Sequence, residues 1–95
     1  MKTDTEILEK AALKASQILH IPVGYIDKLK FVYLYILLYN LMGQGKDGKP
    51  CDKGDENMRH WLNTHNKHLD FCPAARLTDE YSMNQIISYL ESFDK

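Results

Sequence analysis

Apolar side chains recur at helical spacing along the first part of the chain, and this pattern predicts two helices. Over residues 4–19 they return every three or four positions, as on one face of an α-helix: Ile7, Leu8, Ala11, Ala15, Ile18 and Leu19. Pro22 and Gly24 break this pattern. A second pattern over residues 25–42 predicts a core helix with a wide buried face, comprising Ile26, Leu29, Val32, Tyr33, Ile36, Leu37, Asn40 and Leu41.

A glycine-rich loop is expected to follow the second helix. Residues 43–55 contain four glycines and one proline and show no apolar period. A third helix is expected to begin at Asp52 or Asp55 and to run to about Asn63. Its pattern predicts that it buries Met58, Trp61 and Leu62.

The last quarter of the chain predicts a short helical turn and a final helix. Pro73 favours the first position of a turn that extends through Arg76. Thr78 is expected to cap the final helix, whose apolar stripe comprises Met83, Ile86, Ile87, Leu90 and Phe93. No stretch alternates apolar and polar residues with the period of two that is typical of a strand. The predicted fold class is therefore all-α, a small single-domain bundle of four to five helices.

Composition narrows the classes of function. A chain of 95 residues forms one domain, and 44% hydrophobic with 26% charged residues is typical of a soluble globular protein. The net charge of −1 offers no cationic field for nucleic acid. The apolar run 31–43 is shorter than the roughly 20 residues that span a membrane. Because the N-terminus lacks an apolar signal core, we expect a cytoplasmic protein.

Histidines and cysteines suggest a metal site that their spacing does not favour. His60, His65, His68 and Cys72 follow one another closely, and Cys51 lies upstream. Zinc sites pair ligands at C-x2–4-C or H-x3–5-H spacing, and no cysteine pair fits the first pattern. The run also crosses an expected helix end, which points its side chains in different directions. No acid is identifiable that would orient Cys72 and His68 for nucleophilic catalysis. We therefore expect no enzyme, metal or cofactor, with a zinc-binding adaptor as the weaker alternative.

Residues 11–29 resemble the first half of a helix-turn-helix. A polar recognition helix should follow such a segment. The chain instead enters the apolar run, so the half that reads DNA is missing or degenerate. A DNA-binding or autoregulatory transcription factor is therefore an alternative function, with weak DNA binding at most.

An ordered set of residues after position 30 carries a resemblance to a known family. An apolar helix ends in Leu41-Met42-Gly43, and Arg59-His60-Trp61-Leu62 follows a loop. The spacing W-L-x3-N-x2-L-x3-P then places Asn66, Leu69 and Pro73, and Leu77 and Tyr89-Leu90 complete the set. This set resembles the toxin-binding domain of the Xre/MbcA/ParS antitoxin family. The chain departs from the family pattern at His65, where proline is common, and at Asp70-Phe71, where glycines are common.

The resemblance implies a function in a type II toxin–antitoxin system. Residues 1–29 would be a helical N-terminal segment, the remnant of an Xre-like region, and residues 30–95 the toxin-binding domain. The partner would be a RES-domain toxin that consumes NAD, whose active site this chain would occlude. A homodimer is also possible in the family. The residues expected to bind the partner are Phe71, Arg76, Tyr81, Tyr89, Phe93, Asp94 and Lys95.

A second group of residues is expected to hold the structure of this domain. Trp61 and Leu62 end a helix inside the core, and Asn66 suits the left-handed or turn geometry that stops it. Leu69 then returns to the core, and Pro73 starts the next turn. The expected structural motif comprises Arg59, Trp61, Leu62, Asn66, Leu69 and Pro73.

Overall fold

The structure is a computed structural model that describes residues 4–45, 49 and 51–93. These residues form an all-α domain, as the sequence predicts, and contain no strand. The backbones of Asn66 and Phe71 form an isolated antiparallel bridge. The elements in chain order are α1 (Asp4–Leu19), α2 (Lys28–Leu38), a π-helical turn η1 (Tyr39–Gly43), α3 (Asp52–Asn63), a 3-10 turn η2 (Pro73–Arg76) and α4 (Glu80–Glu91). No helix among them is long and apolar enough to cross a bilayer.

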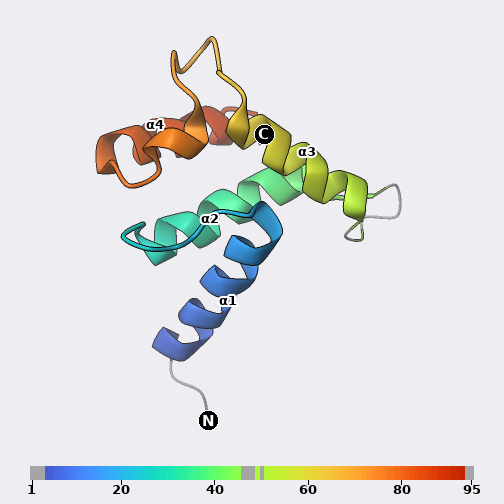
Figure 1. Cartoon of the computed structure of the whole chain (residues 1–95), viewed down its shortest axis with the longest axis vertical. Helices are drawn as coiled ribbons and strands as arrows, with labels where there is room; N and C mark the ends of the chain where they lie inside the picture. The colour runs from blue at the N-terminus through green and yellow to red at the C-terminus, as the bar shows by residue number, and fades with distance from the viewer. Residues whose placement is uncertain (1–3, 46–48, 50, 94–95) are drawn as a thin grey trace.

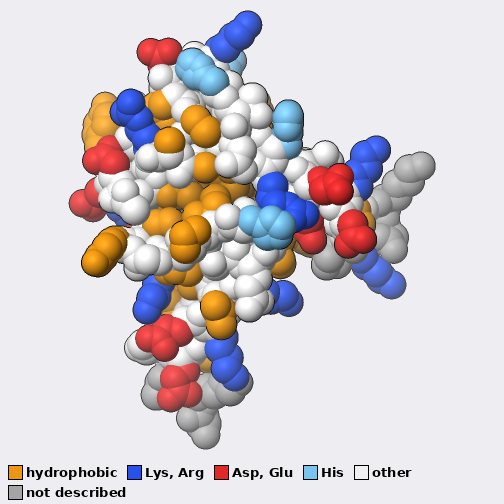
Figure 2. Space-filling model, viewed as in Figure 1, with side chains coloured by type: hydrophobic (Ala, Val, Ile, Leu, Met, Phe, Trp, Pro, Cys, Tyr) orange, Lys and Arg blue, Asp and Glu red, His pale blue; other side chains and the backbone are white. Residues whose placement is uncertain are grey.

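The helices are arranged around α2. Figure 1 shows α2 between α1 and α4, with α3 crossing its far end, and α3 packs against η1, which continues α2. Apolar side chains gather over the middle of the molecule, where α2 crosses it, and charged side chains lie toward the edges (Figure 2). The largest fully buried side chains come from all four helices and η2: Leu19, Phe31, Leu34, Leu38, Met58, Leu62, Pro73, Met83, Ile86 and Leu90.

The buried face of α2 differs from the predicted one. Leu29, Tyr33 and Ile36 were expected in the core, but they are 66%, 40% and 45% exposed. The buried residues of this helix are instead Phe31, Leu34, Leu37 and Leu38. An apolar period selects a buried face only when the opposite face is polar. Because α2 is apolar on nearly every side, contacts with neighbouring helices decide which side is buried.

Apolar residues near the chain ends also lie outside the core. Ile7, on the predicted face of α1, is 55% exposed, because the buried positions of this helix begin only at Ala12. Phe93, the last residue of the predicted stripe of the final helix, is 56% exposed and follows the end of α4. Both residues continue the apolar pattern of their helix, but they lie beyond the part of the helix that another element covers.

Helix α2 begins three residues later than predicted. The Asp27 carboxylate accepts a hydrogen bond from the backbone N–H of Lys30 at 3.1 Å, which caps the first turn. The predicted start at Tyr25 falls in a turn after Gly24, whose φ of 46° is left-handed. A short acidic side chain thus places the start of the helix where hydrophobic spacing alone cannot.

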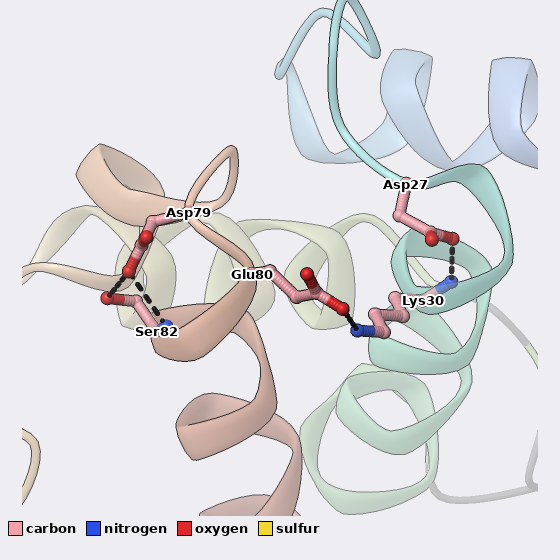
Figure 3. Close-up of polar contacts among 5 residues, drawn as sticks. All are labelled: Asp27, Lys30, Asp79, Glu80 and Ser82. Atoms are coloured by element: carbon pink, nitrogen blue, oxygen red, sulfur yellow. Dashed lines mark hydrogen bonds and ion pairs between the residues drawn. The ribbon is translucent and has the colours of Figure 1, made fainter.

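Asp79, not Thr78, caps α4. Its carboxylate accepts hydrogen bonds from the backbone N–H of Ser82 at 3.0 Å and from the Ser82 hydroxyl at 2.6 Å (Figure 3). The predicted cap was one residue too early. Carboxylate and hydroxyl side chains are both good caps, so neighbouring candidates are distinguished only by the backbone conformation.

The crossing of η1 and α3 leaves no room for a side chain. A Cβ added to Gly54 would lie 2.1 Å from the carbonyl oxygen of Gly43 and 2.5 Å from its carbonyl carbon. A Cβ on Gly43 would lie 2.9 Å from the Met58 side chain. Gly54 therefore sets how closely α3 approaches the end of α2, whereas a side chain at Gly43 would displace the flexible end of Met58.

Gly54→Ala should destabilise the fold by about 3 kcal/mol, because the backbone of η1 must move to admit the methyl group. Urea denaturation measures the change in the free energy of unfolding. Lys53→Ala, at the exposed neighbouring position, should change it by less than about 0.5 kcal/mol. Equal effects of the two substitutions would contradict the close helix crossing.

The Asp79 cap should make stability depend on pH. Hydrogen bonds from Ser82 lower the pKa of Asp79 below its usual value of 3.8. A lowered pKa in the folded state contributes stability above the unfolded pKa, and this contribution is lost as pH falls through the folded pKa. Asp79→Ala should therefore be less stable than the wild type at neutral pH, and the difference should shrink below pH 3.8. Urea denaturation across this range measures it. Thr78→Ala is the control, and an equal loss there would contradict the assignment of the cap.

Candidate functional site

Four aromatic rings from three segments meet at the end of α4. Tyr89 lies at the centre, with its ring stacked on Trp61 at 6.4 Å between centroids and on His68 at 5.4 Å. Phe93 meets the same ring edge to face at 5.0 Å. Trp61 and Tyr89 are half-buried, whereas His68 and Phe93 are exposed. We call Trp61, His68, Tyr89 and Phe93 the aromatic cluster.

The end of α3 positions Trp61. Leu62 is fully buried and anchors the last turn, while its carbonyl oxygen accepts a hydrogen bond from the Cys72 thiol at 3.2 Å. Trp61 was expected inside the core, but it lies at the core's margin and keeps part of its ring accessible. Its indole therefore both contributes to the scaffold and forms part of a surface.

A closed loop after α3 positions His68. The side-chain oxygen of Asn66 accepts hydrogen bonds from the backbone N–H groups of His68 at 2.9 Å and Leu69 at 3.0 Å. The backbone of Asn66 also pairs with Phe71, its N–H donating to the Phe71 carbonyl at 3.1 Å, and its carbonyl accepts from Asp70 at 2.7 Å. Four hydrogen bonds on one residue thus hold a six-residue loop, residues 66–71.

The left-handed residue of this loop is Asp70, with φ of 65°. Asn66 was expected either to take left-handed geometry or to form a turn. Its side chain forms the turn, in an arrangement typical of asparagine. The helix itself ends earlier, at Asn63, and Thr64 is extended. Aspartate tolerates this conformation better than most side chains.

The remaining motif residues hold the two ends of this segment. Arg59 approaches His20, at the end of α1, with 3.3 Å between Nη1 and Nε2. Leu69 is half-buried against the core, and Pro73 is buried at the first position of η2. Every residue of the expected motif therefore lies in or beside the segment that runs from α3 to η2.

The structure separates the predicted partner-binding residues into groups. Tyr89 and Phe93 belong to the aromatic cluster, while the Arg76 guanidinium lies over the Phe71 ring at 5.1 Å from its centroid. Tyr81 is 71% exposed on the first turn of α4, eight residues before Tyr89 and thus about 12 Å away along the helix axis. Asp94 and Lys95 lie outside the described residues.

The contact of His68 with the Tyr89 ring was not predicted. The sequence suggested His68 only as a metal ligand, as a partner of Cys72 in nucleophilic catalysis, or as a polar histidine on the surface. Its contact with Tyr89 joins residues 21 positions apart, which no local period reveals. The one signal in the sequence that could have predicted this contact was the imidazole ring of His68, in a polar loop close to Trp61.

Each cysteine contacts one end of α3. The Cys51 sulfur accepts a hydrogen bond from the Gly54 N–H at 3.2 Å and so caps the first turn, while Cys72 contacts the last. Among the described residues, no group of three or more His, Cys, Asp and Glu side chains is close enough to hold a metal ion. His65 instead lies 3.7 Å from the carboxylate of Asp70.

A shallow hollow of about 220 Å³ adjoins the aromatic cluster. Trp61 and Met42 supply its apolar surface, and the other lining residues are Asn57, His60, Thr64, His65 and Asn66. Trp61 therefore lies between this hollow and the ring of Tyr89. An apolar body with a polar rim is typical of a site that receives a side chain of another protein.

Comparison with protein-family models found no match for this chain, and a search of curated proteins found no significant match.

Asn66→Ala should loosen the loop that carries His68. Loss of two side-chain hydrogen bonds should reduce the free energy of unfolding by about 1–2 kcal/mol and speed amide exchange at His68 and Leu69. Hydrogen–deuterium exchange followed by NMR measures both effects. Asn84→Ala, an exposed asparagine on α4, is the control and should change neither. Unchanged exchange in the Asn66 variant would show that the side chain does not hold the loop.

Proposed function

We propose that this chain is an antitoxin that binds a RES-type, NAD-consuming toxin and occludes its active site. The proposal rests on one observation: the residues that resemble the antitoxin family are also the residues that build the candidate site. The ordered residues Trp61, Leu62, Asn66, Leu69 and Pro73 are those that resemble the antitoxin family, and the same residues hold the segment beside the aromatic cluster. A scaffold motif in such a role would position a binding surface.

The aromatic cluster suits a protein partner. Tyrosine and tryptophan are enriched among the residues that dominate binding energy, because they bury a large rigid surface at little cost in conformational entropy. In the proposed complex, Tyr89 and Phe93 cover the entrance of the toxin's cleft, and the hollow beside Trp61 receives a toxin side chain. Inhibition then requires no chemistry from this chain, only the exclusion of NAD from the cleft.

A second contact is proposed at the Phe71–Arg76 pair. The Arg76 guanidinium is exposed and held over an aromatic ring, which favours one orientation of a flexible side chain. Its donors suit a carboxylate of the partner at the rim of the interface. Tyr81, farther along α4, would contact the toxin only if the interface extends over the whole helix.

The test is co-expression of the full chain with a RES-domain toxin encoded by the adjacent open reading frame. The two proteins should co-purify, and the chain should relieve the growth arrest that the toxin causes. Phe93→Ala should weaken binding at least tenfold, about 1.4 kcal/mol, because it removes an exposed ring from the cluster. Isothermal titration calorimetry measures this change.

Tyr25→Ala is the matched control, because Tyr25 is 99% exposed and lies before α2, apart from the aromatic cluster. It should bind the toxin as the wild type does. Failure of the wild-type chain both to co-purify with the toxin and to relieve growth arrest would refute the proposed function. Normal binding by the Phe93 variant would place the interface elsewhere on the chain.

A further inference from the structure

A row of apolar side chains on α2 faces outward. Leu29, Tyr33 and Ile36 are 66%, 40% and 45% exposed, and Val32 beside them is half-buried. Their spacing of i, i+3, i+4 and i+7 places all four on one face of the helix. We call these four residues the α2 stripe. With Lys30 they line a hollow of about 410 Å³ to which only α2 contributes, so the stripe is an open helix face.

We infer that the α2 stripe is the contact surface of a homodimer, in which α2 of a second copy packs antiparallel across it. A twofold interface must be complementary to itself. The four positions are symmetric about the midpoint between residues 32 and 33. An antiparallel copy therefore places Leu29 against Ile36 of the second chain, and Val32 against Tyr33.

Charges beside the stripe agree with this pairing. The Tyr33 hydroxyl donates to the Glu91 carboxylate at 2.7 Å, so Glu91 lies near the middle of the stripe on the α4 side. Lys30 lies on that side too, with its Nζ 3.2 Å from the Glu80 carboxylate (Figure 3). In the antiparallel pair, Glu91 of the second copy lies beside Val32 of the first copy, two residues from Lys30. Each Lys30 then has a carboxylate of the other copy nearby, and by symmetry the interface contains two such pairs.

The opposite side of the stripe favours the same orientation. Lys28 pairs with Glu9 of α1 at 3.6 Å, so both flanks carry charges of both signs. A mixed, paired rim suits a copy of itself better than a strongly basic or acidic partner.

The area of the stripe sets the strength of the dimer. Four partly exposed apolar side chains offer on the order of 300 Å² on each copy, which is within the range of the largest apolar patch on a monomer. Stable dimers bury about 800 Å² on each side. The dimer should therefore be weak and reversible, with a dissociation constant in the micromolar range or above. The stripe lies on α2 and the aromatic cluster between α3 and α4, so the dimer does not depend on the proposed toxin partner.

Sedimentation equilibrium of the full chain, over concentrations from about 10 μM to about 1 mM, tests the dimer. The wild type should shift from monomer toward dimer, and Ile36→Glu should raise the dissociation constant at least tenfold. Leu13→Glu on α1 is the control, since Leu13 is 57% exposed outside the stripe, and it should associate as the wild type does. Circular dichroism verifies the helical content of each variant. A wild type that stays monomeric throughout, or an Ile36 variant that dimerises normally, would overturn the inference.

Disulfide trapping tests the antiparallel register. Leu29→Cys and Ile36→Cys are each made in a chain whose native cysteines are replaced by serine, which can also cap a helix. An oxidised mixture of the two variants should form a disulfide-linked dimer, whereas neither variant should do so alone. Linkage of each variant with itself would indicate parallel helices and contradict the proposed pairing.

Discussion

The burial of one side of α2 is the constraint on which the other elements depend. Helices α1 and α4 pack directly against it, and α3 packs against η1, which continues the same segment. Phe31, Leu34 and Leu38 have no exposed surface, so these three side chains fix the rotation of α2 about its axis. That rotation turns a second apolar row outward, and the exposed stripe is a direct consequence of the choice of core face.

The segment between α3 and α4 depends on a different kind of constraint. Its loop contributes little to the core and is held by polar contacts, four of them made by Asn66. Buried Leu62 before the loop and buried Pro73 after it hold its two ends. Because both ends are fixed, rings at the margin of the core can be held in place while remaining accessible. This combination of rigidity and exposure is what a binding surface requires, since little order is lost on association.

The sequence predicted most helix boundaries, but it predicted buried faces unevenly. The bounds of α1, α3 and η2 agree with the apolar period and with Pro73, because local signals decide them. For α4, the period correctly identified Met83, Ile86, Ile87 and Leu90 as buried, since the opposite face of that helix is polar. For α2 the same reasoning selected Leu29 and Ile36, which face outward. A helix without a polar face carries no information about its own orientation.

The candidate site was also predicted only in part, in its local features and not in its long-range contacts. The spacing of Trp61, Leu62, Asn66 and Pro73 correctly indicated a helix end, a turn and a new helical start, all of which involve residues close together in the chain. The stacking of His68 and Trp61 on Tyr89 joins residues 21 and 28 positions apart. Which rings meet depends on where the ends of α3 and α4 lie relative to each other, and that follows from the packing of α4 on α2 and of α3 on η1. Local backbone preferences thus determine the elements, whereas the surfaces they present arise only when the helices pack, because each helix can bury only the side its neighbours cover.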